Sequence, residues 1–139
     1  MATGPLRRLL AASVLLCAAA RAEVVATDDA GRRIVMPSPA TRIVSLAPHA
    51  TELLFAAGAG NQVVGVSDYS DFPATARQLP SVGGSMQLDL ERIIALKPDL
   101  IIAWTSGNSP KQVARLRALG FAVFESEPRQ FEDVASSLE

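Results

Sequence analysis

Residues 89–104 read DLERIIALKPDLIIAW, and this stretch decides the fold class. Asp89 is a typical N-cap for a helix over 90–96, in which apolar side chains recur at the spacing of one helix face. A Lys-Pro-Asp sequence at 97–99 ends that helix. The all-apolar run at 100–103 then predicts a strand buried on both faces, as strands of parallel sheets are. A helix followed at once by such a strand is typical of α/β proteins.

The same alternation extends on both sides of this stretch. The expected strands are 42–46, 62–66 and 122–125, the expected helices are 50–57, 110–119 and 131–139, and a polar loop is expected over 67–87. Ser109 is the expected N-cap of the helix over 110–119. The pattern at 24–36 predicts a β-hairpin that precedes these elements. Strands alternating with helices over short connections predict an α/β fold with a parallel sheet and right-handed crossovers.

The N-terminus has the pattern of a cleavable export signal. Arg7 and Arg8 precede an apolar stretch at 9–20, and Ala20-Arg21-Ala22 is a small-x-small cleavage motif. The apolar stretch is too short for a transmembrane anchor, which needs about 20 residues. We therefore expect residues 1–22 to be a signal peptide, 23–41 to be the hairpin and a linker, and 42–139 to be one incomplete lobe.

The composition argues against several function classes. A lipid-anchored product would use Cys17, but Leu16 stands where a lipobox has a small residue, so a soluble exported product is favoured. Cleavage after Ala22 removes this only cysteine, and with it any disulfide or thiolate metal site. The chain has 13 basic and 14 acidic residues, and three of its arginines lie in the signal. With no basic stripe on an acidic chain, nucleic-acid binding is not expected.

Candidate binding residues gather where the predicted strands end. Ligands of parallel sheets bind beyond the carboxyl ends of the strands, and the only Tyr, Trp and His of the chain, Tyr69, Trp104 and His49, all fall at this edge. An aromatic side chain buries roughly 150–250 Å² when it is covered, so the pair of Tyr69 and Trp104 favours a ligand surface. The alternative for Trp104 is a cap on the core, because tryptophan is usually mostly buried.

Signals for catalysis are absent from the sequence. Gly58-Ala59-Gly60 follows a helix instead of opening one, so it lacks the context of a dinucleotide loop. There is no G-x-S-x-G motif, and His49 has no second histidine with which to hold a metal. Asp68 and Asp71 are spaced as paired carboxylates, but this spacing is more typical of a solvated turn. We therefore predict a protein that is not an enzyme and that has no cofactor and no metal.

Several motifs together resemble the N-terminal lobe of the Fe/B12-type periplasmic solute-binding proteins. They are RIVSLAPHATELLFAAGAGNQVVGVSDYSDFP at 42–73, VGG at 82–84, LERIIALKPDLIIAW at 90–104 and ALG at 118–120. DDAGRRIVMP at 28–37 also resembles the opening hairpin of siderophore- and haem-binding members. The resemblance implies a monomeric, periplasmic component of an ABC importer. Its two lobes, joined by a long helix, would hold cobalamin or a related corrinoid and deliver it to an inner-membrane permease.

The resemblance also implies roles for individual residues. Tyr69 matches a tyrosine that contacts the corrin, Trp104 matches a tryptophan that lines the cleft, and Pro48 lies at the same edge. Ser85 stands where a corrinoid binder has a second cleft tryptophan, so it is the departure from the pattern. Glu91 matches an exposed glutamate that docks this lobe onto arginines of the permease.

Other interpretations remain open from the sequence. The cargo is alternatively haem or a ferric siderophore, and the chain is alternatively a fragment of an exported α/β enzyme or a structural or signalling anchor. The helix expected at 131–139 carries no stop signal, which predicts that the chain ends early in the interlobe helix. One lobe offers half of a cleft, so we expect weak binding by this lobe alone.

Overall fold

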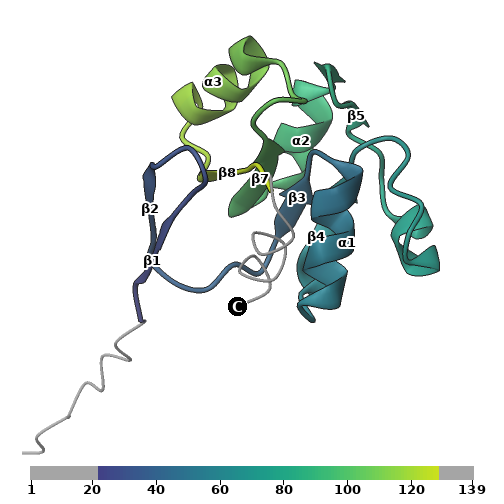
Figure 1. Cartoon of the computed structure of the whole chain (residues 1–139), viewed down its shortest axis with the longest axis horizontal. Coiled ribbons are helices and arrows are strands. Elements are labelled where there is room, and N and C mark those ends of the chain that lie inside the picture. The colour runs from purple at the N-terminus through teal and green to yellow at the C-terminus, as the bar shows by residue number, and fades with distance from the viewer. Residues whose placement is uncertain (1–21, 129–139) are drawn as a thin grey trace, which may run out of the picture.

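The structure is a computed structural model, and it describes residues 22–128. Four strands form a parallel sheet in the order β4-β3-β7-β8 (Figure 1): β3 (Ile43–Ser45), β4 (Val63–Val66), β7 (Leu100–Trp104) and β8 (Val123–Ser126). The predicted parallel α/β sheet is confirmed, with small differences at the strand ends. The helix predicted at 131–139 and almost all of the predicted signal peptide lie outside the described residues.

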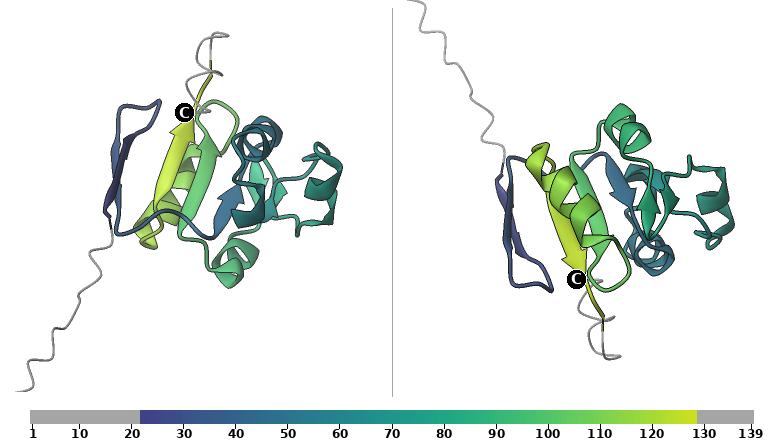
Figure 2. Two further views of the ribbon diagram at one scale, coloured as in Figure 1. Left: turned by 90° about the horizontal axis from the view of Figure 1, so that it is seen from below. Right: turned by 90° about the horizontal axis from the view of Figure 1, so that it is seen from above.

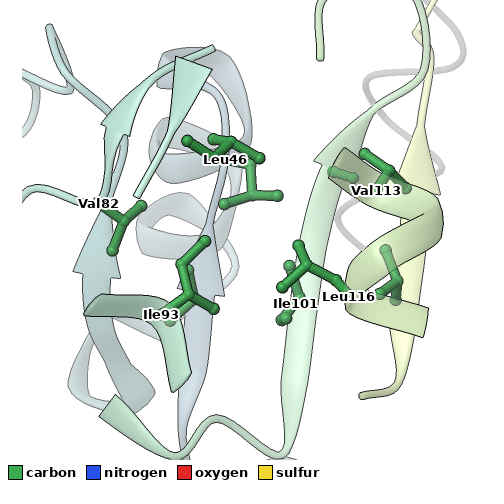
Figure 3. Packing of buried hydrophobic residues seen from close by; sticks show 10 residues of the cluster. Leu46, Val82, Ile93, Ile101, Val113 and Leu116 are labelled. Carbon is green, nitrogen blue, oxygen red and sulfur yellow. The ribbon is translucent and has the colours of Figure 1, made fainter. Parts of the chain in front are cut away.

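Three α-helices cover the two faces of the sheet. Helices α2 (Leu90–Leu96) and α3 (Pro110–Ala118) pack on one face, and α1 (Pro48–Ala56) lies on the other (Figure 3). Between the sheet and the first pair of helices lies the core, formed by Val44, Leu46, Val82, Leu88, Ile93, Ile101, Ala103, Val113, Leu116 and Val123. Residues 89–104 supply both α2 and the strand β7 that crosses this core.

The ends of α2 are set by side chains that satisfy its backbone. The Asp89 carboxylate accepts a hydrogen bond from the Arg92 N–H at 3.0 Å, so the predicted N-cap is confirmed. At the other end Lys97 takes a left-handed conformation with φ 49°, and the Arg42 guanidinium donates to the Leu96 carbonyl at 2.6 Å. Because Arg42 directly precedes β3, these bonds hold the end of α2 beside the first strand of the sheet.

Helix α3 begins without the side-chain cap that we expected. Ser109 does occupy the N-cap position, but its hydroxyl makes no capping hydrogen bond, so that part of the prediction is wrong. Pro110 explains how the helix begins without it, because proline at the first position has no N–H that needs a partner. Gly120, with φ 93°, follows the helix end as predicted.

The segment between β4 and α2 is more structured than the predicted polar loop over 67–87. It holds a 3₁₀ helix, η2 (Ala74–Gln78), and a short antiparallel pair, β5 (Gly83–Gly84) and β6 (Gln87–Leu88). Another 3₁₀ helix, η1 (Gly60–Gln62), precedes β4. Val82 and Leu88 are buried and join the core. The prediction was wrong because two-residue strands are too short to show an alternating pattern.

The predicted hairpin is confirmed and lies beside β8 at the edge of the sheet (Figure 2). Its strands are β1 (Val24–Thr27) and β2 (Arg33–Met36). The buried Asp28 carboxylate, in the turn between them, accepts hydrogen bonds from the N–H groups of Arg32 at 2.7 Å and Glu125 at 3.2 Å. The bond from Glu125, together with the Asp29 N–H that donates to the Glu125 carbonyl at 3.0 Å, joins the hairpin to β8, which it does not extend by strand pairing.

The face covered by α1 keeps an apolar groove of about 250 Å³ between the helix and the sheet. Leu53 and Leu54 line it from α1, and Leu100, Ile102 and Phe124 line it from the strands. Leu100 and Ile102 are only half-buried, so β7 is not fully buried on both faces by residues 22–128. Within the same range, no helix is both long and apolar enough to cross a membrane.

Candidate functional site

Trp104 stands at the carboxyl end of β7, where a tight turn begins. The N–H groups of Gly107 and Asn108 both donate to the Trp104 carbonyl, at 3.3 and 2.9 Å. A Cβ atom at Gly107 would overlap the indole, so the ring lies directly against the Gly107 backbone. This position therefore requires glycine for a close approach, and the turn supplies one support for the half-buried ring.

His49, in the first turn of α1, supports the same indole from another side. The centroids of the two rings lie 5.3 Å apart, with an interplanar angle of 81° that is typical of an edge-to-face contact. Burial lowers the pKa of His49 below its ordinary value of 6.5, while the charges of Glu127 and Glu52 oppose that shift. Its Nε2 atom is buried and has no hydrogen-bond partner among the described residues. His49 therefore helps to orient Trp104, and its burial favours the neutral form of the imidazole ring.

Tyr69 is presented in a different way, on a turn that follows β4. Its side chain is 86% exposed, and its backbone takes a left-handed conformation with φ 65°. The Asp68 N–H donates to the Gly83 carbonyl at 2.9 Å, and the Asp71 N–H donates to the Tyr69 carbonyl at 2.9 Å. The first bond fixes the turn to β5, and the second is a bond within the turn. The phenol takes part in neither bond and stays exposed for a ligand.

Four buried hydroxyl groups lie beneath the Tyr69 turn. The Thr51 hydroxyl of α1 lies 2.9 Å from the Ser45 hydroxyl and 3.1 Å from the Ser70 hydroxyl. The hydroxyl oxygens of Ser67 and Ser70 lie 3.3 Å apart. Ser45 ends β3 and Ser67 follows β4, so the network joins two strand ends to a helix. Buried polar groups are costly unless paired, so this network specifies one position for the turn. Sequence analysis missed it, although polar residues at the ends of apolar strands were the available signal.

Ser85 and Pro48 lie at the same edge, but in different settings. Pro48 is the first residue of α1 and is half-buried next to His49. Ser85 is also half-buried, in the turn between β5 and β6, and its carbonyl accepts a hydrogen bond from the Asn108 side chain at 2.8 Å. Asn108 is a further residue that sequence analysis missed, because its partners are distant in the chain.

The carboxylates at this edge have structural partners. Asp68 accepts a hydrogen bond from the Ser81 hydroxyl, and Asp71 lies 3.9 Å from the Arg77 guanidinium. Both contacts agree with the turn interpretation of these two residues. Glu91 is exposed in the first turn of α2, in a different element from Trp104 and Tyr69. Residues 22–128 contain no group of three His, Cys, Asp or Glu side chains that could hold a metal ion.

Comparison with known proteins shows similarity to binding proteins. Residues 43–139 match the profile of a family described as periplasmic binding protein. The vitamin B12-binding protein of Vibrio cholerae is 47% identical over 106 residues, and that of Yersinia pestis is 44% identical over 107 residues. Each alignment covers 76% of this chain. The chain spans 38% of the length of both relatives.

Solved structures give the same grouping. The crystal structure of the periplasmic vitamin B12-binding protein of Vibrio cholerae matches with a TM-score of 0.69 and 48% identity, over 71% of this chain and 39% of that one. A periplasmic heme-binding protein from Pseudomonas aeruginosa matches with a TM-score of 0.66 and 32% identity, over 71% of this chain and 36% of that one.

Proposed function

The chain belongs to the periplasmic binding protein family, and we propose that it forms one wall of a cleft that captures cobalamin or a related corrinoid for an ABC importer. The observation that carries this proposal is the pair of aromatic side chains at one sheet edge, with Trp104 supported by His49 and Gly107 and Tyr69 held out on a tied turn. The similarity of this chain to vitamin B12-binding proteins supports the choice of ligand.

The aromatic pair suits a broad, flat organic ligand. An aromatic side chain buries roughly 150–250 Å² when it is fully covered, and the half-buried Trp104 has less of this surface left to bury than Tyr69. Trp104 is already supported on two sides, so binding has little rotamer freedom to remove from it. Tyr69 starts 86% exposed, so a ligand that covers it removes a large apolar area from water.

The role that we propose is capture and release without catalysis. The only histidine of the chain, His49, has a buried Nε2 atom and packs its ring against Trp104. That arrangement serves to orient an indole, whereas a general base must present a nitrogen to the reacting group. The chemistry of such a site would be stacking and desolvation of the ligand.

Delivery to a membrane permease is the second part of the proposal. Glu91 is exposed in the first turn of α2, where it is free to meet arginines of a partner. An exposed ion pair is typically worth about 0–1 kcal/mol, so Glu91 would set orientation more than affinity. We place this step in the periplasm, after export directed by residues 1–22 and cleavage after Ala22.

Haem is the second candidate ligand. The similarity to a periplasmic heme-binding protein of Pseudomonas aeruginosa supports it, and the exposed phenol of Tyr69 is a possible iron ligand. A ferric siderophore belongs to the same alternative. All three cargoes are large and partly apolar, so the fold alone does not separate them.

A titration with cyanocobalamin tests the proposal. Trp104 is the only tryptophan, so its fluorescence reports on this edge alone, and we expect saturable quenching by cyanocobalamin. Tyr69→Ala should weaken binding about tenfold, which corresponds to a loss of about 1.4 kcal/mol from one aromatic contact. Val25→Ala is the matched control, because Val25 is an exposed apolar residue of the distant hairpin.

Parallel titrations with hemin and with a ferric siderophore separate the candidates. Tighter binding of hemin, with a shifted Soret band that disappears in Tyr69→Ala, would favour the haem alternative. Binding of none of the three ligands, or equal binding by Tyr69→Ala and the parent protein, would contradict the proposed site.

A further inference from the structure

A single buried side-chain amide, that of Asn108, bonds to three separate segments at the carboxyl edge. Asn108 is 2% exposed. Its Nδ2 group donates to the Leu46 carbonyl at 3.0 Å and to the Ser85 carbonyl at 2.8 Å, and its Oδ1 atom accepts from the Trp104 N–H at 2.6 Å. The partners lie after β3, between β5 and β6, and at the end of β7. One side chain therefore sets the spacing of these segments.

The chemistry of the contact requires an amide. Both N–H groups meet carbonyl oxygens, and the oxygen meets an N–H group, so one orientation of the amide satisfies all three partners. An aspartate at 108 has the same shape but would present carboxylate oxygens to the carbonyls of Leu46 and Ser85. Leu46 is fully buried, so water does not reach this carbonyl easily to replace the lost donor.

Asn108 is linked directly to the backbone of Trp104. The Asn108 backbone N–H donates to the Trp104 carbonyl at 2.9 Å, while its side chain accepts from the Trp104 N–H. Asn108 therefore holds both polar groups of the Trp104 backbone. Gly107, the residue before it, supports the indole ring itself. A displacement of Asn108 would move the ring and its support together.

The turn that carries Ser85 is held at two points. Asn108 binds it at the Ser85 carbonyl, and the Gln112 side chain binds the other end, where it accepts from the Leu88 N–H at 3.0 Å and donates to the Leu88 carbonyl at 3.1 Å. Only the first of these contacts also reaches Trp104. The two amides thus offer a matched comparison, because both stabilise the same short hairpin.

We propose that Asn108 is a positioning residue that fixes the Ser85 turn relative to the end of β7, where Trp104 stands, and through this which planar ligands this edge accepts. The specificity part rests on the proposed binding function. The positioning part rests only on the contacts above, and it is measurable without ligand.

Asn108→Asp and Asn108→Ala test the positioning part, with Gln112→Leu as the control. At equal far-UV circular dichroism, we expect both Asn108 variants to lose most of the near-UV signal of Trp104 and to raise its acrylamide quenching constant about twofold, because the ring loses its fixed support. Gln112→Leu should leave both signals unchanged. Unchanged Trp104 signals in Asn108→Asp would overturn the proposal, and so would an equal change in Gln112→Leu.

Hydrogen exchange in the unmodified protein decides the matter if the variants do not fold. The chain has one other asparagine, Asn61, which is exposed. Both side-chain amide protons of Asn108 should exchange at least about tenfold more slowly than those of Asn61, because each is bonded and buried. Equal exchange at the two asparagines would overturn the proposal.

Cyanocobalamin titration of the same variants tests the specificity part of the proposal. We expect Asn108→Asp to bind cyanocobalamin about tenfold more weakly than the parent protein does, and Gln112→Leu to bind within about twofold of it. Equal affinities in Asn108→Asp and the parent would overturn the specificity part. If the parent binds no cyanocobalamin, the proposed function fails, while the Trp104 signals still decide whether Asn108 positions the ring.

Discussion

At the scale of single residues, the site depends on contacts made by small groups. Gly107 matters because it has no side chain, which lets the indole of Trp104 lie on its backbone. His49 matters for its ring, which meets the same indole edge-to-face at 5.3 Å. Neither residue needs to touch a ligand. Both act by restricting where Trp104 is, so the aromatic surface exists before a ligand arrives.

The lowered pKa of His49 predicts how stability depends on pH. Burial disfavours the charged ring, so the folded protein binds this proton less readily than the unfolded chain does. Below its ordinary value of 6.5 the unfolded chain takes up the proton first. The free energy of unfolding should therefore fall as the pH falls from about 6.5 toward the folded-state pKa, and this effect should level off below that value.

Urea unfolding at about pH 7.5 and about pH 5.5 checks this expectation, with His49→Gln as the variant that cannot titrate. The difference between the two pH values should shrink in His49→Gln. An unchanged difference would show that other groups cause it.

Asp99 does not interfere with this test, although its pKa is also lowered. Burial raises the pKa of Asp99, but hydrogen bonds from Thr41 and Arg42 outweigh burial. Its stabilisation is present above 3.8 and is lost only at more acidic pH.

At the scale of elements, helix starts bring the site residues to the sheet edge. Helix α1 carries Pro48 and His49 in its first turn and buries the Thr51 hydroxyl under the Tyr69 turn. Helix α2 carries Glu91 in its first turn. Helices of a parallel α/β sheet run against the strands, so their first turns and the strand ends share one edge. The same topology that forms the core thus gathers the candidate residues.

The two N-cap positions of α2 and α3 should respond differently to substitution. Asp89→Ala removes a carboxylate that accepts from the Arg92 N–H, and it should cost about 0.5–2 kcal/mol of unfolding free energy. Ser109→Ala removes a hydroxyl that makes no capping bond, and it should change stability by less than about 0.5 kcal/mol. Chemical unfolding of both variants measures this contrast. Equal losses would mean that Ser109 caps α3 in solution.

At the scale of the whole molecule, the hairpin is joined to the sheet by charge and hydrogen bonds. Besides the bonds to Arg32 and Glu125, the Asp28 carboxylate lies 4.0 Å from the Arg117 guanidinium of α3, and Arg117 lies 3.3 Å from Glu125. The hairpin therefore meets both β8 and α3 through one buried carboxylate. Buried charges are strongly destabilising when one partner is removed.

Asp28→Ala should release the hairpin from the sheet. We expect a loss of about 2–3 kcal/mol, because two N–H groups and a guanidinium lose a buried acceptor. Hydrogen exchange should show lost protection at 24–36 and retained protection in β7. Asp29→Ala is the control, since Asp29 bonds the Glu127 N–H at an exposed position and should cost less. Uniform loss of protection in both segments would show that the hairpin and the sheet unfold as one unit.

Local sequence patterns were sufficient to predict the order and type of the main elements. The helix over 90–96, the strand that ends at Trp104 and the hairpin over 24–36 are confirmed, because cap residues, prolines and periodic apolar residues act over a few positions. These patterns also placed Tyr69, Trp104 and His49 at one edge, because parallel topology assigns every strand end to the same side.

Which groups meet at that edge depends on the folding of the whole chain. Asn108 and Leu46 are 62 residues apart in the chain, and the Ser45, Thr51, Ser67 and Ser70 hydroxyls come from three segments, β3, α1 and the turn after β4. The missed strands β5 and β6 have a different origin, because a two-residue strand is too short to show an alternating pattern. Hydrogen bonds between distant segments depend on how the chain packs, and local sequence patterns carry no record of that packing. The aromatic pair was therefore predictable, whereas the polar contacts that hold it in place were not.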